Sequence, residues 1–438
     1  MRAILNRWYA NNKNVINTTK YLVVSLLLLF VVWLFDVSQP DWYGRLPQVF
    51  LLSAETSKQF LTTVAGVFLT VATFTFTTIL TVMTTYSSSF TPRVVQRFIS
   101  KPHVLSLIGI FIGGFFYAVL SLFVVQAVPS DKRLLAGTLG VLYAIASMIE
   151  FMRFVQRVIR DIRIVNVVQD IYDEACELVE KEVAERKEAV RIGEDKSDRT
   201  LAILANETGY FYDLNVELLR SRLADVACEL VIEKKIGEYV AKGVQIADLH
   251  LLDTPGKENK AQDEKTFSED IAACFLFNKA KNDTRDYHHE LSMLVEIALR
   301  AISPAVNDPN TAINCIGKIS SLLGQLFATK NRFIVMRDSE HATIIYKTYS
   351  IEEELYLNFY QLIHYGKEDP SVAQAILEGL YLIYLIADDS AKDSIGTFFA
   401  DAYDTLLEHA GNDLDKKHLR AVQVEFQKQH EKRLARVS

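Results

Sequence analysis

The sequence predicts an α-helical membrane domain of four transmembrane helices, followed by a helix-rich α+β cytoplasmic domain with a small β-sheet or barrel-like element. The 438-residue chain combines a positive mean hydropathy with 23% charged residues, which is typical of a chain divided between lipid and water. Residues 1–163 hold 15 basic and 6 acidic residues, and the remainder holds 32 and 48, so the net charges are +9 and −16. This division argues against a single globular domain, a disordered chain and a secreted disulfide-rich domain.

Four stretches of the predicted membrane domain, residues 1–163, are long and apolar enough to span a bilayer. A spanning helix needs about 20 predominantly apolar residues. Inside these stretches Lys and Arg are absent, and the acidic residues are Asp36 and Glu150, each near an end. The first stretch lacks a small-residue cleavage site, so we interpret it as an anchor and not as a signal peptide. The four predicted spans are about 21–37, 60–86, 103–128 and 134–152.

Basic residues are concentrated on one side of these spans. They precede the first span, lie between the second and third, and follow the fourth, whereas the other two loops contain few. The positive-inside rule therefore places both termini in the cytoplasm, with the chain crossing a bacterial inner membrane several times. At this predicted interface, Arg93, Arg97, Arg153 and Arg157 are either ordinary topology determinants or contacts for lipid headgroups or an anion. Glu150 precedes Arg153 by three residues and can pair with it.

The second span is rich in threonine, which a lipid-facing helix has no reason to prefer over an apolar residue. The threonines recur at steps of three and four residues and so share one helical stripe with Gly66. One interpretation is that each hydroxyl binds a carbonyl of the preceding turn and that small residues permit close helix packing. The other is that the stripe lines a water-filled path in an oligomer. The pore-lining candidates are Thr63, Thr70, Thr73, Thr77, Thr81 and Thr84.

The cytoplasmic part divides into three sections by pattern. Residues 164–200 form a charged helix and a linker, residues 201–266 a small β-containing subdomain, and residues 267–438 a mainly helical subdomain. In the second section Gly237 and Gly243 indicate tight turns between short strands. The third contains a strand pair at 332–336 and 343–348, followed by four helices. Expected strands of the second section are residues 209–214, 227–232 and 244–251.

A group of polar residues lies between residues 285 and 308 of the helical section. Asp308 is a natural N-cap before Pro309, and Asn307 can adopt a left-handed turn conformation. Three interpretations stay open: a buried polar joint between two helices, a site for an ion or small ligand, and a catalytic site. The candidates are Arg285, Asp286, His289, Glu296, Arg300, Asn307 and Asp308.

The string from Leu294 to Ala312, which contains Ser303-Pro304 and Asn307-Asp308-Pro309, is similar to the signature of an uncharacterised bacterial "predicted membrane protein" family, classed as a domain of unknown function. The stretch Ser89-Phe90-Thr91-Pro92-Arg93 resembles another element of that family, with Thr91 where Ser is usual. Asn310 departs from the bulky residue that follows Asn-Asp-Pro in the family. The resemblance implies four spans and a soluble C-terminal region, and implies no activity.

Several functional classes find no support in the sequence. Phosphate-binding loops, zinc-protease motifs and nucleophile elbows are absent, so we expect no enzyme and no cofactor. The four cysteines are far apart and have no histidine at ligand spacing, so we expect no metal site. An acidic soluble part disfavours nucleic acid as a partner.

Two functional hypotheses remain. The first is a homo-oligomeric ion channel or transporter-like pore in the lipid bilayer, gated by its cytoplasmic domain. The alternative is a membrane-anchored sensor or scaffold whose cytoplasmic domain binds an ion, a small ligand or a protein partner, with no transport activity.

Overall fold

The structure is a computed structural model of the chain, and its backbone divides into two compact units, Met1–Val167 and Val168–Ser438. We call them the N-terminal unit and the C-terminal unit and describe each by itself. The residues that the structure describes are 2–38, 47, 50–89, 93–95, 102–129, 132–161, 163–189, 199–224, 226–252, 264–279, 286–337 and 342–437.

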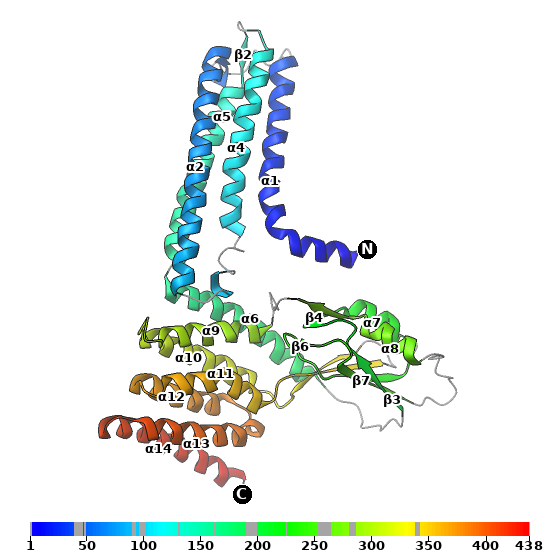
Figure 1. Ribbon diagram of the computed structural model, residues 1–438, viewed down its shortest axis with the longest axis vertical. Helices are drawn as coiled ribbons and strands as arrows, with labels where there is room; N and C mark the ends of the chain where they lie inside the picture. Colours follow the sequence, from blue (N-terminus) through cyan, green and yellow to red (C-terminus); the bar gives the residue numbers. More distant parts are fainter. Residues whose placement is uncertain are drawn as a thin grey trace. The chain divides into compact units, whose positions relative to one another are not determined.

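Four long helices make up most of the described N-terminal unit, and each is long and apolar enough to cross a membrane (Figure 1). The four predicted spans are confirmed in number and place, and each helix extends beyond at least one predicted end. Helix α4 packs against α1, α2 and α5, and α2 also packs against α5. The helices are α1 (Arg2–Ser38), α2 (Ala54–Ser89), α4 (Pro102–Ala127) and α5 (Ala136–Asp161).

Aromatic side chains fill the space between these helices. The ring of Phe68 on α2 lies 6.2 Å from that of Phe111 and 5.5 Å from that of Tyr143. Tyr117 is fully buried, stacks on Tyr143, and donates its hydroxyl to the carbonyl of Ala136. Large buried rings of this kind are a main source of packing energy inside a protein.

A carboxylate joins the end of α1 to the start of α5. The Asp36 side chain is fully buried, and its two oxygens accept the backbone N–H groups of Leu135 and Ala136 at 2.9 and 3.0 Å. These two N–H groups open α5 and have no partner within that helix. Next to this cap, the short strands β1 (Leu52–Ser53) and β2 (Arg133–Leu134) pair antiparallel.

The C-terminal unit begins within α6 (Ile164–Glu188) and contains two sheets in its described part (Figure 1). The larger sheet has the order β3-β7-β5-β10-β9, in which β10 runs parallel to β5 and all other neighbours are antiparallel. The smaller sheet has the order β6-β4-β8. The strands are β3 (Arg199–Leu204), β4 (Gly209–Leu214), β5 (Cys228–Ile232), β6 (Tyr239–Val240), β7 (Gln245–Leu251), β8 (Phe275–Asn278), β9 (Phe333–Arg337) and β10 (Ala342–Lys347).

One hydrophobic core lies between the two sheets and the helices α7 (Val216–Leu223) and α8 (Glu264–Ala272). Its fully buried residues include Leu230, Leu249, Ile271 and Ile344, and each such side chain contributes about 1.5–3 kcal/mol relative to an exposed position. The strands expected at 209–214, 227–232 and 244–251 are present, whereas β3 and β8 were not expected from the sequence. The turn glycines Gly237 and Gly243 both have positive φ, as their predicted role requires.

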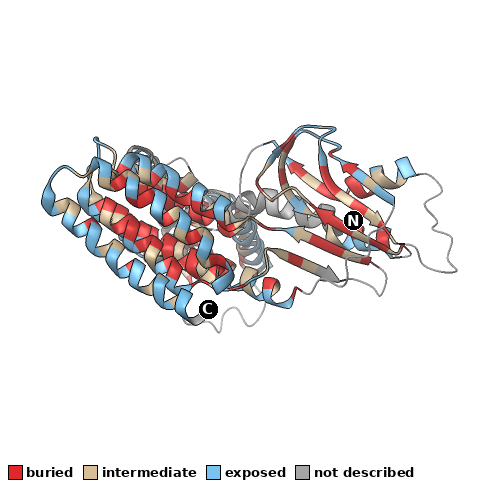
Figure 2. Ribbon diagram, turned by 90° about the horizontal axis from the view of Figure 1, so that it is seen from below, coloured by how far each residue is buried: buried red, intermediate tan, exposed pale blue. Residues whose placement is uncertain are grey.

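The remaining helices of the C-terminal unit pack on one another as layers, with buried residues on their facing sides (Figure 2). Helix α10 packs between α9 and α12, and α12 also contacts α13 and α14. The four helices expected after the strand pair are all present. The helices are α9 (Tyr287–Ala301), α10 (Pro309–Leu326), α11 (Ile351–Gly366), α12 (Pro370–Ile386), α13 (Lys392–His409) and α14 (Asp413–Val437).

Candidate functional sites: a threonine face and a buried polar cluster

The threonine stripe of α2 lies on the surface of the N-terminal unit. Thr63, Thr70, Thr73, Thr77, Thr81 and Thr84 are all exposed, and a Cβ added at Gly66 would meet nothing within 4 Å. The buried side of the same helix carries Leu61, Phe68, Thr75, Ile79 and Val82. At about 100° per residue, the two sets are centred about 180° apart around the helix axis. The stripe, which we call the threonine face, therefore points away from the other three spanning helices.

Each hydroxyl of the threonine face donates to a backbone carbonyl one turn earlier. Thr70 binds the carbonyl of Gly66 at 2.9 Å, and Thr77 binds that of Thr73 at 3.0 Å. The remaining members follow the same pattern. This bonding satisfies the hydroxyl hydrogens without a second helix, while the oxygen lone pairs and the small side chains remain available at the surface. The geometry agrees with the packing interpretation and leaves the pore interpretation open.

Three of the four predicted interface arginines, Arg93, Arg153 and Arg157, lie among the residues that the structure describes. Glu150 on α5 forms ion pairs with Arg153 at 3.3 Å and Arg157 at 3.1 Å, which confirms the pairing expected from their spacing. Arg93 is half-buried, and Arg97 lies outside the described residues. Exposed ion pairs such as those of Glu150 contribute about 0–1 kcal/mol, so they carry little of the stability.

The predicted polar motif of the C-terminal unit forms two helix caps. The Asp286 carboxylate accepts the His289 N–H at 2.7 Å and caps α9. Asp308 caps α10 through the Thr311 N–H, with Pro309 at the first turn, as expected. Asn307 has φ of +50°, which confirms its left-handed conformation. Of the other predicted members, Glu296 is half-buried and Arg300 exposed on α9, and Arg285 lies outside the described residues.

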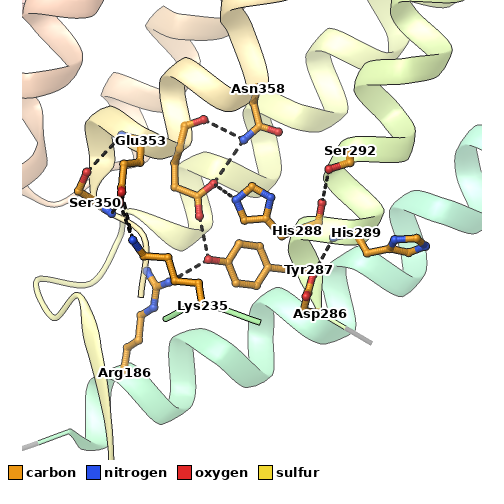
Figure 3. Close-up of polar contacts among 11 residues, drawn as sticks. Arg186, Lys235, Asp286, Tyr287, His288, His289, Ser292, Ser350, Glu353 and Asn358 are labelled. Carbon is orange, nitrogen blue, oxygen red and sulfur yellow. Dashed lines mark hydrogen bonds and ion pairs between the residues drawn. The ribbon is translucent and has the colours of Figure 1, made fainter. Parts of the chain in front are cut away.

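Next to this motif lies a buried polar cluster centred on Glu354, which is fully buried on α11. Its carboxylate accepts the Tyr287 hydroxyl at 2.8 Å and the Asn358 amide at 3.3 Å. His288 Nε2 lies 3.2 Å from the second oxygen and forms an ion pair with it when protonated. Figure 3 shows the Tyr287, His288 and Asn358 side chains pointing toward one another, whereas His289 points away.

The cluster extends to the end of α6 through Arg186, whose side chain is fully buried. Its Nε binds Glu182 at 2.9 Å, and its Nη2 donates to the Tyr287 hydroxyl at 3.2 Å. Asn331 in turn donates to the carbonyls of Arg186 and Ala189. We call Glu182, Arg186, Tyr287, His288, Glu354 and Asn358 the Glu354 cluster, and it joins α6, α9 and α11.

The pKa values of the cluster are set by burial, which disfavours the charged forms, and by close contacts, which oppose or add to that effect. Burial alone would raise the pKa of Glu354, but the positive charge of His288 and the Tyr287 hydroxyl outweigh it, so this pKa is lowered. Burial raises the pKa of Glu182 despite Arg186 beside it. Burial, with the nearby Glu354 charge, raises the pKa of Tyr287 well above its ordinary value. Glu354 is therefore an ionised carboxylate inside the unit, held by hydrogen bonds from Tyr287 and Asn358 and by the nearby His288 ring.

A second layer of contacts connects the cluster to the sheets. The His288 ring lies 4.2 Å from the Tyr349 ring, and Lys235 Nζ lies 4.9 Å from the same tyrosine ring. Lys235 also binds Glu353 at 3.1 Å, next to Glu354 on α11. Because Lys235 follows β5 and Tyr349 follows β10, the cluster lies where the helices of the C-terminal unit meet its larger sheet.

Sequence reasoning placed a polar site near residue 286 and missed most members of the cluster. The predicted motif includes His289 and not His288, and it does not include Glu354 from the acidic run 352–354. One signal in the sequence points to Glu354. It falls on the same helical face as Ile351, Asn358 and Leu362, and all three of these are buried in the structure. A glutamate on an apolar helix face requires buried partners.

The contribution of Glu354 to stability is expected to decline in acid. Its pKa is lowered from an ordinary value of 4.5 on folding, so its stabilising effect is fully present above that value. The effect is lost as the pH falls through the lower folded pKa. The difference in the free energy of unfolding between the wild type and Glu354→Gln should therefore shrink below about pH 4.5. Urea unfolding of the detergent-solubilised chain, followed by circular dichroism from neutral to acidic pH, measures this difference. A difference that stays constant across the range would contradict the assignment.

Residues 14–381 match the family described as "Predicted membrane protein (DUF2254)", which is 368 of the 438 residues. The chain belongs to this family. The match confirms the family resemblance seen in the Ser303-Pro304 and Asn307-Asp308-Pro309 string, and it includes all four spanning helices and the Glu354 cluster. The protein is thus a membrane protein with several apolar spanning helices.

Part of this chain is similar to uncharacterized proteins of Mycobacterium bovis and Mycobacterium tuberculosis. Each is 26% identical over 178 residues, which cover 40% of this chain and 33% of the relative. The match therefore spans a third of the length of these curated relatives. No solved structure matches the chain. Among the described residues, no three His, Cys, Asp or Glu side chains gather as a metal site would require.

Proposed function

We propose that this protein is a homo-oligomeric ion channel or transporter-like pore of the bacterial inner membrane, in which copies associate through the threonine face of α2 and the C-terminal unit gates the path. The threonine face carries this proposal. It is a continuous stripe of small hydroxyl-bearing residues on the outer surface of a spanning helix, opposite the side that packs against the same chain.

The interior of one N-terminal unit does not favour a path through a single chain. Phe68, Phe111, Tyr117 and Tyr143 fill the space between the helices, and three of them are at most 3% exposed. Four spans per chain are also few for a monomeric pore. A polar path is therefore expected between copies, where closed rotational symmetry places the same face of each subunit around one axis.

The threonine face suits such an interface for two reasons. Small side chains allow the backbones of neighbouring spanning helices to approach closely, which is what stabilises helix association in lipid. Hydroxyl oxygens whose hydrogens are already bound to carbonyls still offer lone pairs to a passing cation or water. Exposed apolar residues flank the stripe, among them Val67 and Phe74 on one side and Leu69 and Phe76 on the other.

A link from the C-terminal unit to the spanning helices supports gating. Only residues 162 and 163 separate α5 from α6 along the chain. The far end of α6 is held by the fully buried Arg186, which contacts α9 through Tyr287. A rearrangement of the Glu354 cluster would therefore move α6 and, through the chain, the end of α5. From the distribution of basic residues we place this unit in the cytoplasm together with both termini.

A membrane-anchored sensor or scaffold without transport is the second candidate, and the exposed side of α11 favours it. Tyr356 and Tyr360 stack there at 4.7 Å, and both are about half exposed. Exposed aromatic residues are enriched at protein interfaces. We propose no enzymatic activity for either candidate.

Replacement of Thr70, Thr73 and Thr77 by leucine is expected to disrupt the oligomer and abolish ion flux, because three bulky side chains would hold the helices apart. Replacement of the same three by valine keeps their shape and removes the hydroxyls. That variant should remain oligomeric and lose most of its flux, by about tenfold or more for a path lined by the stripe. Oligomeric state is measured by mass photometry in nanodiscs, and flux by ion release from liposomes that contain the full chain.

The control is Thr78→Leu with Thr85→Leu, the same substitution on the same helix but outside the threonine face, which should leave both readouts unchanged. A monomeric wild type would exclude the pore. An oligomer that passes no ions would exclude transport and favour the sensor or scaffold. Flux that is unaffected by the valine and leucine variants would remove the threonine face from the path.

A further inference from the structure

Arg186 of the Glu354 cluster and the neighbouring Arg332 have buried N–H groups that the described part of the chain does not bind. Arg186 Nη1 and Arg332 Nε and Nη2 are closed to solvent and have no hydrogen-bond partner in the described part of the chain. The Arg186 side chain is itself fully buried. A buried donor left without a partner is destabilising, more so on a charged group, so three of them on two neighbouring arginines require an acceptor.

The two arginines belong to one neighbourhood. Asn331, adjacent to Arg332 in the chain, donates to the backbone carbonyl of Arg186 at 2.7 Å. Burial and, after it, the positive charge of Arg186 lower the pKa of Arg332 to about 10. The second of these effects requires the two guanidinium groups to be close enough to repel one another.

The ion pairs of this neighbourhood do not include Arg332 within the described residues. Arg186 is paired with Glu182, and Glu354 with His288. Arg332 has no carboxylate within ion-pair distance among the described residues. Its Nη1 donates to the carbonyls of Thr329 and Asn331, and its guanidinium lies 5.6 Å from the Phe327 ring. Asp388 and Glu354 attract this guanidinium from a greater distance, and one oxygen of Asp388 already accepts the N–H and hydroxyl of Ser390.

We propose that Arg332 and Arg186 form a binding site for a small oxyanion, such as sulfate, phosphate or a carboxylate. Nε and Nη2 are the two parallel donors on one edge of a guanidinium, the edge that binds a carboxylate or phosphate group in a bidentate manner. Arg186 Nη1 supplies a third donor. The anion neutralises the unpaired charge of Arg332 and satisfies all three N–H groups. This inference goes beyond the proposed function and is independent of whether the protein conducts ions.

The burial of the donors limits the size of the anion. Because the three nitrogen atoms are closed to solvent, the site suits a free ion and not the headgroup of a lipid still held in a bilayer. Arg332 as a whole is half-buried. The site is built on α6 and on the segment after α10, so an anion bound there would stabilise the junction at which α6 is anchored.

Equilibrium dialysis of the detergent-solubilised full chain with ³⁵S-sulfate, at an ionic strength held constant with sodium chloride, tests this site. We expect saturable binding that approaches about one ion per chain, with unlabelled phosphate as a competitor. Arg332→Lys keeps the charge but loses the bidentate edge, so it should raise the dissociation constant by at least about tenfold. The control is Arg222→Lys, an arginine of the same unit that pairs with Asp270 at 3.1 Å and is not among the buried unpartnered groups, and it should leave the binding unchanged.

The absence of saturable binding to the wild type would overturn the proposal, because ordered water would then be the acceptor for these donors. Equal affinity in Arg332→Lys would also overturn it, since the ion would lie elsewhere. A second measurement needs no variant: anomalous diffraction from wild-type crystals equilibrated with selenate. A selenium peak between Arg186 and Arg332 supports the site, and its absence at a saturating concentration refutes it.

Discussion

Replacement of Glu354 by alanine is expected to lower the free energy of unfolding of the C-terminal unit by about 3–5 kcal/mol. The carboxylate is fully buried, accepts hydrogen bonds from Tyr287 and Asn358, and lies 3.2 Å from His288 Nε2. Its removal leaves these donors in an apolar surrounding and takes a negative charge away from beside the buried Arg186. Breaking a buried ionic network by removing one member costs far more than breaking an exposed pair, because the remaining groups cannot reach water.

Urea unfolding of the detergent-solubilised full chain measures this loss, with two further variants for comparison. Glu354→Gln retains the shape and one acceptor oxygen, so its loss should be smaller, about 1–3 kcal/mol. Glu352→Ala changes an exposed glutamate on the same helical turn and should change stability by about 0.5 kcal/mol or less. If Glu354→Ala and Glu352→Ala proved equally mild, the cluster would not be a centre of stability.

Replacement of Asp36 by alanine is expected to destabilise the N-terminal unit by about 2–4 kcal/mol. The carboxylate binds the N–H groups of Leu135 and Ala136, and α1 and α5 are far apart in the chain. Without it, two backbone donors at the start of α5 lose their partners, one at the buried Ala136 and one at the partly buried Leu135. The negative charge also interacts favourably with the positive end of the α5 dipole, and that interaction would be lost as well.

Tryptophan fluorescence during titration with sodium dodecyl sulfate reports on this unit selectively, because all three tryptophans lie within residues 1–163. Asp36→Asn keeps one oxygen acceptor and should lose about half as much stability as the alanine variant. Glu55→Ala, an exposed acidic residue in the first turn of α2, is the control and should have little effect. A loss in Asp36→Ala no larger than in Glu55→Ala would refute the role of this cap.

Local patterns predicted the elements of this protein well where a single segment contains its own signal. The four spanning helices follow from runs of about 20 apolar residues, since no other structure satisfies the backbone in lipid. The start of α10 follows from Asp308 and Pro309, and the turn before it from Asn307. These features depend on neighbouring residues alone, so they can be predicted without knowledge of the rest of the fold.

Patterns were less informative where the partner lies far away in the chain. The strand pair after α10 was expected. However, β10 also pairs with β5, which lies more than 100 positions earlier, and the sequence of β10 does not indicate that pairing. The strand β3 was missed because it follows a stretch interpreted as a linker. The predicted motif contains His289, yet it is His288 that lies against Glu354 in the structure.

The sequence by itself determined which four stretches are long and apolar enough to span a membrane, and that α2 carries a stripe of threonines. Tertiary structure decided what the polar residues contact: that Asp36 caps α5, that Glu354 is buried among donors from α9 and α11 and lies near Arg186, and that the threonine face points outward. The physical reason is that apolar runs and helix caps act over a few residues, whereas a buried charge is tolerated only beside partners that folding brings from distant segments.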